Sequence, residues 1–233
     1  MTKLGEEQAE SAGNLIKAEG LEFDIVYVSV LQRAIKTLWI AMNAMDRLYL
    51  PVSKTWRLNE RHYGALQGLN KAETAEKFGE AKVMEWRRSY AIPPPPVDPK
   101  SEHHPQNDQR YRNVPLSDLP ATESLATTYQ RFMPEWQGRI APDLKAGKNV
   151  LITAHGNSLR ALVKHLDNIS EKDILAVNIP TGVPLVYEVD RETLKPIKQK
   201  GAIAPLQGRY LGDADAIKAA AEAVANQAKG KKQ

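Results

Sequence analysis

A short apolar strand followed at once by a helix occurs twice in this sequence, and this pattern limits the fold more than any other feature. The first unit runs from a strand predicted over 23–28 into a helix over 31–45, and the second from a strand over 149–154 into a helix over 158–166. Apolar strands that alternate with helices are typical of a parallel sheet covered on both faces. We therefore expect an α/β fold of three layers, with a mostly parallel sheet between helices.

The remaining pattern predicts one domain over residues 1–233 with an insertion at about 60–120. Four prolines at 93–96 end a region of polar helical character, and the chain then stays rich in Pro, Asp, Asn and His as far as Pro120. Loops of this length in a compact domain are usually functional lids or disordered segments. Further elements are expected as helices over 6–19, 70–79, 80–90, from a cap at Thr122, and over 213–227, and as a strand over 184–190. The tail from about 214 to 233 is expected to be flexible.

Composition excludes several classes of function. The chain has no cysteine, so thiol nucleophiles, thiolate metal sites and disulfides are ruled out. No apolar run approaches the roughly 18 residues of a membrane span, and the first residues do not read as a secretory signal, so we expect a cytoplasmic protein. The net charge of +4 fits a small anionic substrate as well as it fits nucleic acid. Nucleic-acid binding is disfavoured because the basic residues are scattered.

The second strand–helix unit carries the strongest chemical signal. Its strand ends at His155, Gly156 permits a tight turn, and Ser158 can cap the next helix. Ligands of open α/β sheets bind at the carboxyl ends of the strands, where His155 falls. A helix N-terminus beside it offers N–H groups to an anion. We favour a functional role for His155 over a histidine that only completes a turn.

The first unit repeats this geometry with an arginine. Arg33 lies in the first turn of its predicted helix, where the helix dipole disfavours a cation. A bound phosphate would offset that cost because guanidinium groups bind phosphate through two hydrogen bonds. A helix residue that simply faces solvent is the equally good alternative from this segment alone.

Other polar clusters are ambiguous by themselves. Glu60 stands among arginines between Arg57 and Gly68, as a proton donor or acceptor or as part of a surface salt-bridge cluster. Lys71 and the pair Arg87-Arg88 could clamp a polyanion or form a solvated helix face. His103-His104 could ligate a metal, but adjacent histidines point apart and no carboxylate spacing completes a site. No nucleotide-binding glycine loop occurs.

Taken together, these segments resemble the cofactor-dependent phosphoglycerate mutases of the histidine phosphatase superfamily. The segments that match keep the order of the family from near residue 3 to Asp213, and the stretch Glu60-Arg-His-Tyr-Gly-Ala-Leu-Gln-Gly68 is typical of the mutases. The others are Ser29-Val-Leu-Gln-Arg-Ala-Ile35, Trp86-Arg-Arg-Ser-Tyr90, Thr122-Glu-Ser-Leu125, Ala154-His-Gly-Asn-Ser-Leu-Arg-Ala161 and Asn178-Ile-Pro-Thr-Gly182.

The resemblance implies interconversion of 3-phosphoglycerate and 2-phosphoglycerate, with 2,3-bisphosphoglycerate as primer, no metal, and a homodimer or homotetramer. Catalysis would fall to Glu60 as general acid/base, to His155 as the histidine that stabilises the transferring phosphoryl group, and to Arg33 as the cation on its oxygens. The substrate would be held by Tyr63, Lys71, Arg87, Arg88, Gly156 and Asn157.

One family element has no counterpart in these 233 residues. Family members begin with a strand that ends in Arg-His-Gly-Glu, whose histidine accepts the phosphoryl group, whereas the sole His-Gly here is His155-Gly156. The resemblance thus implies that the first strand is missing, that strand edges are exposed, and that mutase activity of this chain is impaired. Two other functions stay open: a remnant that only binds bisphosphoglycerate, and a phosphomonoester hydrolase in which His155 and Glu60 assist water.

Overall fold

The computed structural model describes residues 1–229, and within this range it leaves out the side chains of Lys71, Ala72, Ala75, Arg88 and residues 225–229. The helices are α1 (Lys3–Ala18), α2 (Gln32–Met45), α3 (Lys71–Phe78), α4 (Glu80–Arg88), α5 (Leu125–Glu135), α6 (Ala141–Lys145), α7 (Gly156–Leu166) and α8 (Ala214–Lys229). The strands are β1 (Ile25–Val28), β2 (Val52–Lys54), β3 (Val150–Thr153), β4 (Leu185–Val186), β5 (Glu188–Val189), β6 (Pro196–Ile197) and β7 (Arg209–Tyr210).

The central sheet is parallel, as the strand–helix pattern predicts. Its order is β2-β1-β3, with Val26 opposite Val52 on one side and opposite Leu151 on the other. Because β1 has neighbours on both edges, its residues Val26, Tyr27 and Val28 are almost fully buried. Two short antiparallel pairs, β4 with β7 and β5 with β6, accompany this sheet.

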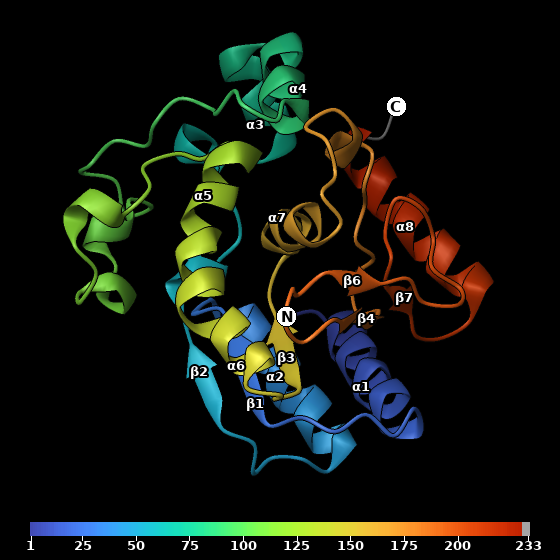
Figure 1. The fold of residues 1–233 in the computed structure, drawn as a ribbon. Coiled ribbons are helices and arrows are strands. Elements are labelled where there is room, and N and C mark those ends of the chain that lie inside the picture. The colour runs from blue at the N-terminus through green and yellow to red at the C-terminus, as the bar shows by residue number, and fades with distance from the viewer. Residues whose placement is uncertain (230–233) are drawn as a thin grey trace.

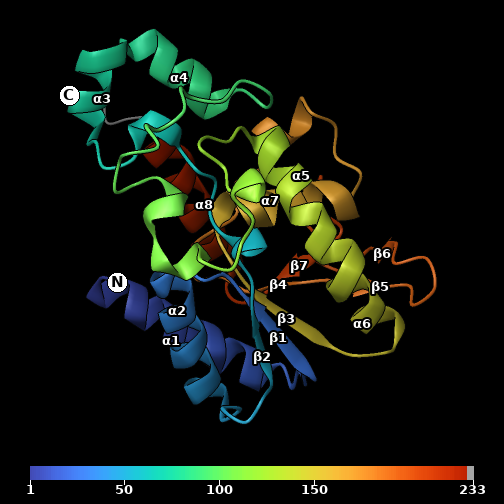
Figure 2. The same ribbon diagram turned by 90° about the vertical axis from the view of Figure 1, so that its left-hand side faces the viewer.

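Side chains of β1 alternate between two hydrophobic layers. Val26 and Val28 pack with α2 residues such as Leu38 and Met42, whereas Tyr27 packs with Phe132 and with other apolar residues of the helices that cover the opposite face. Figure 2 shows α1 and α2 on one side of the sheet and α5 and α6 on the other. The α/β fold with a sheet between helices is therefore confirmed.

Close packing of α1 on α2 depends on a glycine. A Cβ at Gly13 would lie 2.4 Å from the carbonyl oxygen of Ala41, so the two backbones could not approach as they do. Figure 1 shows the two helices running beside the sheet, with α7 leaving the end of β3 and α3 and α4 apart from the sheet at the top. The loop between α4 and α5 contains only single turns of 3₁₀ helix, consistent with its proline-rich sequence.

Two details differ from the sequence prediction. The cap of α5 is Ser124, whose side chain accepts from the Thr127 N–H, and the Thr122 hydroxyl instead donates to the Pro94 carbonyl. The predicted strand over 184–190 is interrupted at Tyr187. Its two halves pair with different strands of the same chain, β4 with β7 and β5 with β6.

Candidate active site

The carboxyl ends of β1 and β3 meet at a buried serine and histidine. Ser29 follows β1 and His155 follows β3, and 2.7 Å separate Ser29 Oγ from His155 Nε2. The side chains are almost inaccessible, with Ser29 0% and His155 8% exposed. Ser29 Oγ also accepts from the Leu31 N–H at 3.2 Å. The carboxyl ends of β1 and β3, where the site is predicted, are thus joined by a hydrogen bond.

His155 is held as a neutral imidazole. Burial lowers the pKa of His155 to about 3, and the positive charges of Arg33 and Arg131 act in the same direction. The residue is also the N-cap of α7, since its N–H donates to Ser158 Oγ at 3.1 Å. The prediction that Ser158 is the N-cap is therefore wrong: Ser158 is the third residue of α7, and its hydroxyl accepts from the His155 N–H.

The Glu60 carboxylate covers the start of α7. Its Oε1 accepts from the Arg61 N–H at 2.7 Å and from the Asn157 N–H at 3.2 Å. The sequence predicts that this helix start offers its N–H groups to an anion, and the carboxylate of Glu60 takes up one of them. Glu60 and the turn His155-Gly156-Asn157, 95 residues apart or more in the chain, are thus in direct contact.

A cavity of about 620 Å³ opens beside Glu60. This volume falls in the range of small-molecule sites. Of the predicted site residues, Arg33, Glu60 and Tyr63 line it. The full wall consists of Leu31, Gln32, Arg33, Trp56, Asn59, Glu60, Arg61, His62, Tyr63, Gln67, Pro105, Arg110, Tyr111, Pro120, Glu123 and Arg131.

Asn157 and His155 do not line the cavity, but Asn157 is hydrogen-bonded to a residue that does. The Asn157 side-chain amide donates to the Tyr63 hydroxyl at 3.1 Å, so Tyr63 and Asn157 act as one unit. His155 and Asn157 are not among the described wall residues. The predicted residues Glu60, Tyr63, Gly156 and Asn157 are therefore brought together, with His155 next to them.

Two arginines in the wall have no acidic partner. Among residues 1–229, no salt bridge joins Arg33 or Arg61 to a carboxylate, whereas Arg131 pairs with Glu123 and Arg110 with Asp108. Arg61 is only 4% exposed and its Nε lacks a hydrogen-bond partner. Its guanidinium lies 4.5 Å from the centre of the Tyr63 ring. Arg33 is exposed, whereas Arg61 is a buried charge that needs a partner, which an anionic ligand could supply.

The described wall of the cavity does not include Lys71, Arg87 or Arg88. The side chains of Lys71 and Arg88 lie outside what the structure describes. Arg87, half-buried near the end of α4, does not line the cavity, and its Nε has no hydrogen-bond partner. The neighbouring Trp86 packs edge-on against Phe78. Their role as substrate ligands stays a prediction.

Sequence reasoning missed four wall residues that reach the cavity from distant segments. Arg110 and Tyr111 come from the long loop, and the Tyr111 hydroxyl accepts from the Asn59 side-chain amide at 2.9 Å. Glu123 and Arg131 come from the start and middle of the α5 region. The Thr122-Glu-Ser-Leu125 match pointed near Glu123, but no local pattern marks the other three.

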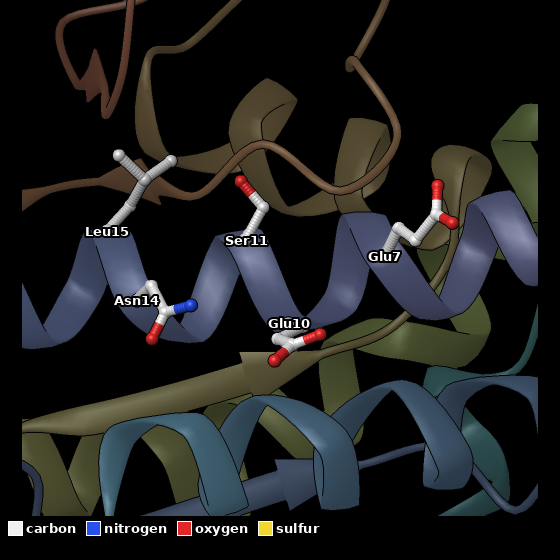
Figure 3. Close-up of a pocket in the computed structure, with 5 residues that line it drawn as sticks. All are labelled: Glu7, Glu10, Ser11, Asn14 and Leu15. Carbon is white, nitrogen blue, oxygen red and sulfur yellow. The ribbon is translucent and has the colours of Figure 1, made fainter.

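The part of the chain that the structure describes offers no group of three or more metal-ligating side chains, and none of its helices is long and apolar enough to cross a membrane. His104 is buried, and its Nδ1 accepts from the Gln106 N–H. A second hollow runs along α1, lined by Glu7, Glu10, Ser11, Asn14 and Leu15 (Figure 3). It contains none of the predicted site residues.

Comparison with known families gives the lineage of this site. A model of the histidine phosphatase superfamily (branch 1) matches residues 1–114 and 96–197. The chain belongs to this superfamily. The match extends over β1, β2 and β3 and over the segments that line the cavity.

Solved structures of other proteins share the fold at low sequence identity. A mycobacterial glucosyl-3-phosphoglycerate phosphatase is 20% identical, with a TM-score of 0.59 over 84% of this chain and 85% of that one. The alpha-ribazole phosphatase from Shigella flexneri is 20% identical, with a TM-score of 0.60 over 91% and 86%. The Bacillus stearothermophilus protein YhfR is 21% identical, with a TM-score of 0.61 over 88% and 85%.

Proposed function

We propose that this histidine phosphatase superfamily chain binds phosphate monoesters of small organic molecules in the cavity beside Glu60 and processes their phosphoryl group. The observation that carries the proposal is the presence of Arg33 and Arg61, without acidic partners, in the same wall as the Glu60 carboxylate. Phosphoryl transfer is promoted mainly by positioning and by positive charge on the phosphoryl oxygens. Both arginines suit that role because guanidinium matches phosphate geometry.

The favoured reaction is hydrolysis of the phosphomonoester. Glu60 is the carboxylate suited to proton transfer, because the other acidic residue of the described wall, Glu123, is bound to Arg131. Glu60 would accept a proton from the attacking water or return one to the leaving oxygen. The named phosphatases of the same fold support this choice. A cavity of about 620 Å³ also has room for a leaving group larger than a three-carbon acid.

Phosphoglycerate mutase activity is the second candidate. It is favoured by the stretch from Glu60 to Gly68 and by the contact of Tyr63 with Asn157. In that reaction the acceptor is a substrate hydroxyl, and 2,3-bisphosphoglycerate is the primer. The unpartnered Nε of Arg61 fits such an anion. Arg33 and Arg61 would hold 2,3-bisphosphoglycerate, and this primer would supply the phosphoryl group.

One pair of assays separates the two reactions. Purified chain receives 3-phosphoglycerate with added 2,3-bisphosphoglycerate, and release of inorganic phosphate and formation of 2-phosphoglycerate are measured side by side. Phosphate release without 2-phosphoglycerate supports hydrolysis, and the reverse supports the mutase. Glu60→Gln should lower either rate by roughly 10²- to 10⁴-fold. The control Arg191→Met, at the far end of β3 where Arg191 donates to the Lys145 carbonyl, should leave the rate unchanged.

The same samples test the binding-only alternative. A folded chain that turns over neither substrate but binds inorganic phosphate by calorimetry is the binding remnant. Absence of turnover in a folded chain contradicts the proposed reaction, and absence of phosphate binding as well contradicts the proposed site.

A further inference from the structure

A single buried arginine holds the backbone on which Glu60 stands. The Arg131 guanidinium reaches from α5 and donates from Nη1 to the carbonyls of Trp56 and Arg57, at 3.1 and 2.8 Å. From Nη2 it donates to the carbonyl of Asn59 at 3.0 Å and, at 3.4 Å, to that of Glu60 itself. Four carbonyls of one irregular segment are thus bound by one side chain.

Glu123 completes this arrangement from the other side. It accepts from Arg131 through both oxygens, with Nε–Oε1 at 2.6 Å and Nη2–Oε2 at 3.0 Å. Its Oε2 also accepts from the His62 N–H at 2.8 Å, and its own N–H donates to the His62 carbonyl at 2.8 Å. The Arg131–Glu123 pair, 8% and 2% exposed, therefore contacts the segment on both sides of Glu60.

Within residues 59–62, the backbone carbonyls of Asn59, Glu60 and His62 accept from Arg131 or Glu123. The side chains of Asn59 and His62 make further hydrogen bonds, to Val30, Tyr111 and His103. This segment lies between the 3₁₀ turns 56–58 and 64–66 and belongs to no helix or strand. Because buried carbonyl groups need hydrogen-bond partners, the positions of Arg131 and Glu123 determine the course of this backbone. The backbone course in turn determines whether the Glu60 carboxylate meets the Asn157 N–H at the start of α7.

We infer that Arg131, fixed by Glu123, is a positioning residue that places the Glu60 carboxylate over the start of α7. Its positive charge also reaches His155. The inference concerns geometry and is tested without turnover, and it rests on the proposed function only where it predicts rates.

The test is a spectroscopic signature that a merely structural role would not move. The Asn157 and Arg61 amides donate to Glu60 Oε1, so their ¹H–¹⁵N resonances report where the carboxylate lies. Glu60→Ala gives the positions of these signals without the carboxylate. Arg131→Met is expected to move both signals more than halfway toward the Glu60→Ala positions. The Val26 amide, bound to the Pro51 carbonyl, is the internal reference and should not move.

Two further variants separate positioning from folding. Removal of one partner of a buried ion pair is strongly destabilising, whereas replacement of both by apolar residues is often tolerated. Arg131→Met combined with Glu123→Leu should therefore recover thermal stability but keep the displaced signals. Arg131→Lys keeps the charge but lacks the planar fork, so it should also displace them. Arg47→Met, which breaks the exposed Arg47–Glu22 pair, is the matched control.

Signals of Asn157 and Arg61 that stay in their wild-type positions in the folded double variant overturn the inference. In turnover, the double variant should lower kcat by roughly 10²-fold, as for a misplaced catalytic group, with KM within about twofold. If the wild-type chain has no turnover, the proposed function fails but the amide signals still decide the positioning role.

Discussion

His155 is the residue whose chemistry depends most on its surroundings. Its pKa is lowered to about 3 by burial first, and then by Arg33 and Arg131, while its Nε2 lies 2.7 Å from Ser29 Oγ. A neutral imidazole donates from one ring nitrogen and accepts at the other without adding charge. The positive charge at this site therefore comes from the arginines.

The neutral state of His155 makes stability depend on pH. Unfolded, the imidazole binds a proton near pH 6.5, whereas folded it stays neutral down to about pH 3. Its contribution is therefore complete above pH 6.5 and is lost as pH falls toward 3, with a slope of about 1.4 kcal/mol per pH unit. We expect urea unfolding of His155→Gln to lose less stability than wild type between pH 7 and 4. Parallel profiles for the two proteins would contradict the lowered pKa.

The sequence pointed to candidate residues that lie in local motifs and missed residues that reach the cavity from distant segments. Glu60 and Tyr63 share one segment, and His155 and Asn157 share one turn, so a strand–turn–helix pattern marks them. Arg131 stands in a helix interior, where an arginine is usually a solvated face. Its role arises only when α5 packs on residues 56–62, and that tertiary contact leaves no mark in the local sequence.

At the scale of elements, predictions succeeded where a segment alone determines its own structure. The strands β1 and β3 and helices α2 and α7 fall within a few residues of their predicted bounds, because apolar periodicity is a local property. The division of β4 from β5 was not predictable in this way. Val186 pairs with Arg209 and Glu188 with Ile197, so the interruption arises because two separate strands, β7 and β6, pair with this segment.

Among the described residues β3 pairs with β1 alone, and this should be visible in hydrogen exchange. The Thr153 carbonyl accepts from the Ser29 N–H, so alternate residues Val150 and Ile152 direct their N–H groups away from β1. Within residues 1–229, β3 pairs with β1 alone, so neither N–H has a strand partner there. We expect both amides to exchange at least tenfold faster than that of Val26, which donates to the Pro51 carbonyl. Equal protection at all three positions would mean that another chain covers this edge.

At the scale of the whole molecule, the cavity joins segments that are far apart in the chain. Its wall takes Arg33 from the start of α2, the segment 56–67, the loop through Tyr111, and Arg131 from α5. The helices α2 and α5 cover opposite faces of the sheet. An anion held by Arg33 and Arg61 would join α2 to the segment 56–62, which Arg131 of α5 holds by its carbonyls, and its binding energy would oppose separation of these parts.

Inorganic phosphate should accordingly raise the melting temperature of the whole chain. A ligand at about 100 times its Kd stabilises by about 2.7 kcal/mol, which for a chain of this size corresponds to roughly 5–10 °C. The combined variant Arg33→Met and Arg61→Met should lose most of this rise, whereas Arg191→Met should keep it. Phosphate also stabilises proteins without binding a site, so each variant is compared with wild type at equal phosphate concentration in calorimetric melts. An equal rise in wild type and the double variant would place the anion elsewhere and remove the main support for a phosphate site between Arg33 and Arg61.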